Sequence, residues 1–144
     1  MKKSVIGIVF AIVAAVFIAA CGSKTETGAK LPTGKTIKAV PAGNLTATLS
    51  NNSGQLKQGN QEFMVAFTDS SGKPVDVGAV SLNFHMAQMG TMAAMNDQTT
   101  FTTTETPGVY RGKASIEMGG EWQAQLAYEG PASSGKTTFT VTAQ

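Results

Sequence analysis

The residues with the clearest chemical potential are four methionines and a histidine in one short stretch. The chain reads His85-Met86-Ala-Gln-Met89-Gly-Thr-Met92-Ala-Ala-Met95, so a methionine recurs at every third position beside the only histidine. Thioethers are soft, neutral ligands that suit Cu(I), and imidazole also binds copper. Because a thioether needs no deprotonation, it stays a ligand in mildly acidic surroundings where histidine and thiolate are lost. We expect Met89, Met92 and Met95 to hold Cu(I), or Ag(I), with His85 and Met86 contributing.

Two other interpretations of the methionines remain open. Methionine is a flexible filler of cores, so Met86 and Met95 could pack inside the domain while His85 is an ordinary exposed residue. In the other interpretation, this chain is a metal-free adaptor module. The segment is then an adaptable apolar surface through which the chain docks onto an envelope complex. Met118 ends a later apolar run and is a further possible ligand, although packing explains it better, and Met64 is assigned no role.

The methionines follow a segment with the alternation of a β-strand. Apolar residues at 80, 82, 84 and 86 alternate with polar ones, which places His85 and Met86 on opposite faces of the predicted strand. Gly90 then allows the chain to turn. The pattern therefore predicts that Met89, Met92 and Met95 lie on a loop at one end of the domain.

The rest of the chain after residue 44 also has a period of two. Apolar alternation recurs at 45–49, 63–67, 80–86, 110–118, 122–128 and 139–143, with Gly, Asn, Asp and Pro turn signals between the runs. No segment has a convincing helical period. The sequence predicts an all-β domain over 45–144, a single antiparallel immunoglobulin-like β-sandwich of about seven strands.

The N-terminal segment has the three-part layout of a secretory signal. Lys2 and Lys3 precede an apolar run, and Ile18-Ala19-Ala20-Cys21 resembles the bacterial lipobox, in which the cysteine is lipidated and becomes the first residue. We expect a signal peptide over 1–20 and a lipidated Cys21 that anchors the protein to a membrane. A flexible tether over 21–44 follows. The expected location is the cell envelope: the outer membrane facing the periplasm in a Gram-negative cell, otherwise the outer face of the cytoplasmic membrane.

Composition excludes several classes of function. Without the two lysines of the signal, nine basic residues balance nine acidic ones, so the chain lacks the positive stripe that nucleic-acid binding needs. One histidine and one lipidated cysteine leave little for acid–base or covalent catalysis, so we expect no enzyme. The Cys, His and carboxylate sets that zinc prefers are also missing. A single cysteine permits no intrachain disulfide, and we expect a monomer.

Several short motifs resemble those of a known family. They are Gly72-Lys73-Pro74-Val75, the strand 80–84 running into the methionines, the segment 107–112 (Pro-Gly-Val-Tyr-Arg-Gly), and 118–122 (Met-Gly-Gly-Glu-Trp). Together they make the stretch from about Leu45 to Ala143 similar to the YtkA-like/FixH-like immunoglobulin-like domains of bacterial envelopes. That resemblance implies metal handling, with a metal-efflux or oxidase-assembly protein as partner. The copper chaperones of the PCuAC kind and the CopC-like proteins use more than one histidine, which this chain lacks.

Overall fold

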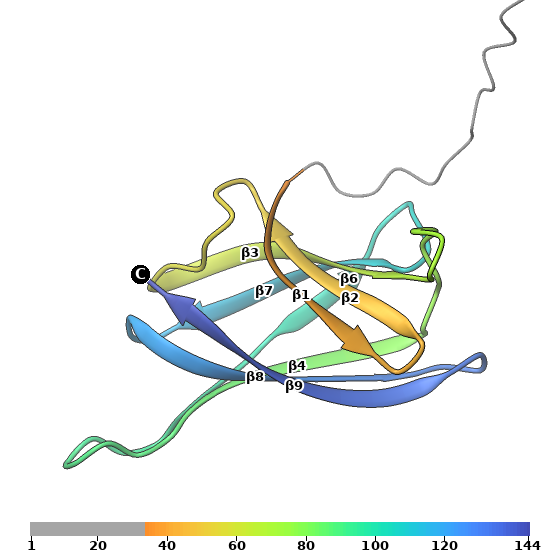
Figure 1. Cartoon of the computed structure of the whole chain (residues 1–144). Helices are drawn as coiled ribbons and strands as arrows, with labels where there is room; N and C mark the ends of the chain where they lie inside the picture. Colours follow the sequence, from red (N-terminus) through yellow and green to blue (C-terminus); the bar gives the residue numbers. More distant parts are fainter. Residues whose placement is uncertain (1–33) are drawn as a thin grey trace, which may run out of the picture.

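The period-two pattern of the sequence builds strands with one buried and one exposed face. The computed structural model describes residues 34–144, and in it β7 (Val109–Ile116) and β8 (Gly120–Glu129) alternate buried and exposed side chains over most of their length. Such strands bury their apolar face only by packing against a second sheet. The described residues accordingly form two antiparallel sheets that face each other (Figure 1).

One sheet has five strands and the other has four. The five-stranded sheet has the order β1-β2-β3-β7-β6, and the four-stranded sheet the order β5-β4-β8-β9. The remaining bounds are β1 (Lys35–Ala42), β2 (Leu45–Asn51), β3 (Gly59–Thr68), β4 (Ala79–Met86), β5 (Met95–Gln98), β6 (Thr100–Thr103) and β9 (Ser134–Ala143). The prediction of an all-β antiparallel sandwich is confirmed.

Aromatic and aliphatic side chains from both sheets fill the space between them. Trp122, Phe63, Phe67 and Phe84 are among the largest fully buried side chains. Phe63 of β3 and Phe84 of β4 meet edge to face across the sandwich, with ring centroids 5.9 Å apart. The Trp122 indole N–H donates a hydrogen bond of 2.9 Å to the carbonyl of Met118, so the one polar atom of this large side chain is satisfied.

The structure corrects the strand count and the boundary of the tether. Within the described residues there are nine strands rather than about seven. Residues 35–42, which the sequence analysis assigned to the tether, form β1 and pair with β2 along their whole length apart from one bulge. Their polar and lysine side chains conceal the strand because β1 is an edge strand with most side chains in solvent. The predicted signal peptide, Cys21 and the first part of the tether lie outside the described residues.

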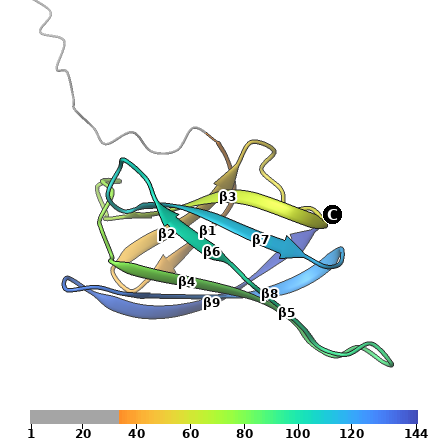
Figure 2. The same cartoon turned by 180° about the vertical axis from the view of Figure 1, so that it is seen from behind.

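The hairpin of β4 and β5 leaves the body of the sandwich. Figure 2, seen from behind, shows the segment that joins the two strands extending past the ends of β8 and β9. We call residues 87–94 the arm. β1 begins at the top of Figures 1 and 2, whereas the arm points toward the bottom of both. Residues 34–144 contain no helix long and apolar enough to span a membrane.

Candidate metal centre

The four clustered methionines form two nested cross-strand pairs. β4 and β5 pair Met86 with Met95, and beyond the ladder an isolated bridge pairs Met89 with Met92. Only Gly90 and Thr91 separate Met89 from Met92, and Gly90 has a φ of +57°, the positive value that the first position of a primed two-residue turn requires. Methionines at every third position are therefore symmetric about this turn. The predicted loop is the tip of a β-hairpin.

Met89 and Met92 form the pair at the tip. Their backbones exchange two hydrogen bonds, from Met89 N–H to the Met92 carbonyl at 3.2 Å and in return at 2.9 Å. Side chains of directly opposed antiparallel residues lie on one face with Cβ atoms about 5 Å apart. The two side chains are 51% and 42% exposed and are the exposed large hydrophobic residues of the described chain. Two thioethers thus stand together in solvent, within reach of one ion.

Met86 and Met95 form the pair at the base of the arm. Met86 is 3% exposed and belongs to the hydrophobic core, and Met95 is partly buried against that core. The Met86 methyl lies so close to Gly120 that a Cβ there would be 3.2 Å from it. Met89 follows Met86 by three positions, an odd number that turns side chains of extended chain to opposite faces. The structure does not bring this pair together with the pair at the tip.

His85 lies on the outer face of the four-stranded sheet, opposite in orientation to Met86, as the alternation predicted. Its Nδ1 is 2.9 Å from Oδ1 of Asn96, and the side-chain amide of Asn83 donates to the same oxygen at 3.3 Å. A carbonyl oxygen only accepts, so this contact requires Nδ1–H to donate, and Nε2 takes no part in it. This partner network fixes the ring's orientation.

The position of His85 separates it from the tip. Met89 lies four residues further along, which corresponds to about 13 Å of extended chain. His85 therefore does not share a centre with Met89 and Met92 in this conformation. Sequence reasoning missed Asn96 as the partner of His85. The symmetry of the hairpin about Gly90-Thr91 would have found it, because the same register that pairs Met86 with Met95 pairs His85 with Asn96.

Two other methionines stand elsewhere in the domain. Met118 is partly buried against the core, and its carbonyl accepts the Trp122 indole hydrogen bond. Met64 is half-buried on β3, opposite Arg111 of β7. Neither is part of the hairpin. Of the two methionine pairs that the hairpin forms, only Met89 and Met92 are exposed.

The chain segment on either side of the tip has no formally charged side chain. No Asp, Glu, Lys or Arg occurs between Asp76 and Asp97. Asp97 itself is buried, and its Oδ2 accepts a hydrogen bond of 3.1 Å from the Glu117 N–H, which ties β5 to the end of β7. Among residues 34–144, no group of three or more His, Cys, Asp or Glu side chains is placed to hold a metal ion.

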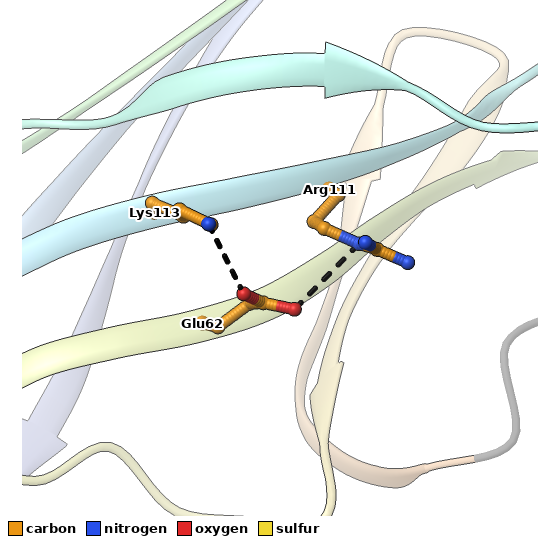
Figure 3. Close-up of polar contacts among 3 residues, drawn as sticks. All are labelled: Glu62, Arg111 and Lys113. Atoms are coloured by element: carbon orange, nitrogen blue, oxygen red, sulfur yellow. Dashed lines mark ion pairs between the residues drawn. The ribbon is translucent and has the colours of Figure 1, made fainter.

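The one cluster of ion pairs in the described residues lies on the other sheet from the methionine hairpin. Glu62 of β3 is 3.6 Å from both Arg111 and Lys113 of β7, on the outer face of the five-stranded sheet (Figure 3). All three side chains are more than half exposed. Exposed pairs of this kind contribute little to stability because water and salt screen them. The cluster is a solvated surface.

Motifs that carry the sequence resemblance serve the fold rather than a site. The Tyr110 hydroxyl donates to Oδ1 of Asp76 at 2.9 Å and accepts from the Val77 N–H at 3.2 Å, which fastens the segment before β4 to β7. Hydrogen bonds from the Gly78 N–H and from Tyr110 lower the pKa of Asp76. Burial and the Asp76 hydrogen bond raise the pKa of Tyr110 to about 12. Both shifts come from structural contacts.

Comparison with known proteins found one match to a sequence family. A family model described as YtkA-like matches residues 40–127, which covers most of both sheets and the whole methionine hairpin. Searches of curated proteins and of solved structures found no match.

Proposed function

The chain belongs to the YtkA-like family, and from that premise we propose that it is an envelope lipoprotein that binds Cu(I) through its methionine hairpin. Its role would be copper buffering, copper tolerance or delivery of the ion to an envelope partner. The observation that carries the proposal is the Met89–Met92 pair: two neighbouring thioethers, exposed on one face at the tip of an arm. Ag(I), which has the same preference for soft ligands, would bind there too.

The chemistry of the pair suits a mobile, reduced ion. Thioethers are neutral and soft, so they favour Cu(I) over Zn²⁺ or Mg²⁺, which prefer thiolate, imidazole or oxygen ligands. Neither sulfur has a proton to lose, so binding would change little in mildly acidic surroundings. Exposure of both side chains leaves one side of a bound ion open. A partner could then take over the ion one ligand at a time.

The five residues predicted as ligands lie in different parts of the hairpin. Met89 and Met92 are the ligands that the proposal rests on. Met95 stands at the base of the arm, Met86 is in the core, and His85 is on the outer face of the sheet with Nε2 free of the Asn96 hydrogen bond. For any of these three to join the tip, the arm would have to fold back on the sheet.

Lipidation of Cys21 would anchor the protein to a membrane. β1, where the described chain begins, starts on the side of the sandwich away from the arm (Figure 1). The first described strand therefore leaves the tip accessible to other envelope proteins. A metal-efflux or oxidase-assembly component is the partner class we propose.

The exposure of the tip also favours a second function. Met89 and Met92 together with the small residues of the arm present an uncharged apolar tip, on which a metal-free adaptor could dock a protein. Replacing both methionines by leucine separates the two functions. Leucine keeps an apolar side chain of similar volume but removes the sulfur, so docking would survive and metal binding would not.

The test is a Cu(I) titration of the full chain in detergent micelles, under reducing and anaerobic conditions, against a chromogenic competing chelator. We expect the wild type and Met64→Leu to take copper from the chelator, and Met89→Leu/Met92→Leu to bind at least tenfold more weakly. Equal binding by the double variant would remove the tip as the site. No binding by the wild type would remove the copper function and leave the adaptor.

A further inference from the structure

The pair at the tip supplies only two soft ligands, which leaves coordination positions of a bound ion open. Beyond the two methionines, the arm consists of Ala87, Gln88, Gly90, Thr91, Ala93 and Ala94, none of which offers a soft ligand. Met86 and Met95 face the core, and His85 is about four strand positions away. A d¹⁰ ion such as Cu(I) has no d-electron preference for one geometry, so it can accept further soft ligands beyond these two. Among residues 34–144, further soft ligands for an ion at the tip would have to come from another molecule.

The shape of the arm leaves room for another molecule at the tip. Both views show the turn extending past the sandwich (Figures 1 and 2). Every residue from 87 to 94 is exposed. The two-residue turn at Gly90 keeps the end of the hairpin narrow. A second hairpin can therefore approach end to end without contact between the two sandwiches.

The absence of charged side chains on the arm favours a second copy of the same chain as the source of further ligands. Like charges oppose the meeting of two identical surfaces, but no Asp, Glu, Lys or Arg lies between Asp76 and Asp97. The small side chains of Ala87, Ala93 and Ala94 also permit close approach. A second copy further supplies the same soft ligand pair, in a geometry that two-fold symmetry makes self-complementary.

We propose that two copies of this chain share one ion, with Met89 and Met92 of each copy supplying four thioethers around a single Cu(I) or Ag(I). This rests on the proposed function, because it concerns the same pair of methionines. The chain is then a monomer without the ion and a dimer with half an equivalent of it. Excess ion separates the dimer again, since each pair then holds an ion of its own.

The experiment titrates Ag(I) into the full chain in detergent micelles and measures the protein molar mass by size-exclusion chromatography with light scattering. Bound silver in each peak is measured as well. We expect a twofold rise in protein mass near half an equivalent of silver, with one silver per two chains, and a return to the monomer mass in excess silver. Met64→Leu should behave as the wild type, and Met89→Leu/Met92→Leu should stay monomeric.

Three outcomes would overturn the proposal in different ways. A monomer that binds one silver at every ratio would overturn the shared site and leave the proposed function standing. No silver binding by the wild type would overturn both. A dimer of the double leucine variant would show that association does not use the thioethers, which also overturns the shared site.

Discussion

The body of the sandwich and its hairpin arm use the same residue type in opposite ways. Met86 and Met89 lie three positions apart on one chain segment, yet one is 3% exposed and the other 51%. In the body, methionine fills space beside aromatic side chains and Gly120. In the arm, about half of its surface is left uncovered by residues 34–144. Regular spacing alone therefore does not make four methionines one site, because the register of the hairpin divides them between core and solvent.

The largest loss of stability should come from removing β1, an edge strand of the five-stranded sheet. A fragment of residues 45–144 lacks β1, which buries Val40 and Ala42 and whose Ala42 carbonyl accepts the Tyr128 hydroxyl at 2.9 Å. We expect its free energy of unfolding to be lower than that of fragment 34–144 by about 4 kcal/mol or more, since buried apolar area and a buried hydrogen bond are lost together. Urea unfolding of both fragments measures this. Equal midpoints would show that β1 is dispensable.

A matched pair of substitutions compares the body and the arm directly. Met86→Ala should lower the free energy of unfolding by about 3 kcal/mol, because it leaves a cavity in the core. Met92→Ala should change it by less than about 0.5 kcal/mol, because the side chain is exposed. Denaturant unfolding of the full chain in one detergent gives both values. Similar losses for the two variants would contradict the division of the hairpin into body and arm.

The Tyr110–Asp76 contact belongs to the body and predicts a pH dependence. Tyr110→Phe should cost about 1–2 kcal/mol, because the buried Val77 N–H loses its acceptor. With its pKa raised to about 12, Tyr110 contributes stability that is complete below its usual pKa of 10.0 and is lost as pH rises toward 12. Asp76, with its pKa lowered, contributes stability above its usual value of 3.8 that is lost as pH falls below it.

Unfolding of the wild type and of Tyr110→Phe between pH 7 and 12 separates this contribution from that of the lysines. The difference in stability between the two proteins should narrow above pH 10. A constant difference over that range would mean that the tyrosine proton has no part in the contact.

The smallest effect on stability is expected at the tip itself. Met89→Leu/Met92→Leu should unfold within about 0.5 kcal/mol of the wild type, because both positions are exposed and the swap keeps volume and apolarity. Thermal unfolding followed by circular dichroism is sufficient. A large loss of stability would show that the tip packs against something, and would favour the filler interpretation.

Sequence patterns predicted the strands that have one apolar face and missed those that do not. The alternation at 45–49, 63–67, 80–86 and 122–128 falls within β2, β3, β4 and β8. β5 and β6 are four-residue edge strands with sequences MNDQ and TFTT, and β1 contains two lysines and a proline. These three edge strands bury few side chains, so no hydrophobic period reveals them, whereas the edge strand β9 buries Phe139, Val141 and Ala143 and was found. Backbone pairing with a neighbour defines them instead.

The candidate site was predictable in composition but not in arrangement. The methionine count and the opposite orientation of His85 and Met86 could be derived from the sequence. The pairing of Met86 with Met95 and of Met89 with Met92 depends on the position of the turn. A turn shifted by one residue would give every residue of the hairpin a different cross-strand partner. Gly90 alone did not determine the position of the turn. The exposure of Met89 against the burial of Met86 follows from it.

The most direct test of the account observes the methionines one by one. In the full chain labelled with ¹³C at the methionine methyl groups, NMR spectra recorded during Ag(I) addition would report each thioether, with signals assigned by Met→Leu variants. The account predicts that the Met89 and Met92 methyl signals shift while those of Met86, Met95 and Met118 stay in place. Shifts of Met86 and Met95 together with the tip would contradict it, because all four methionines would then form one centre.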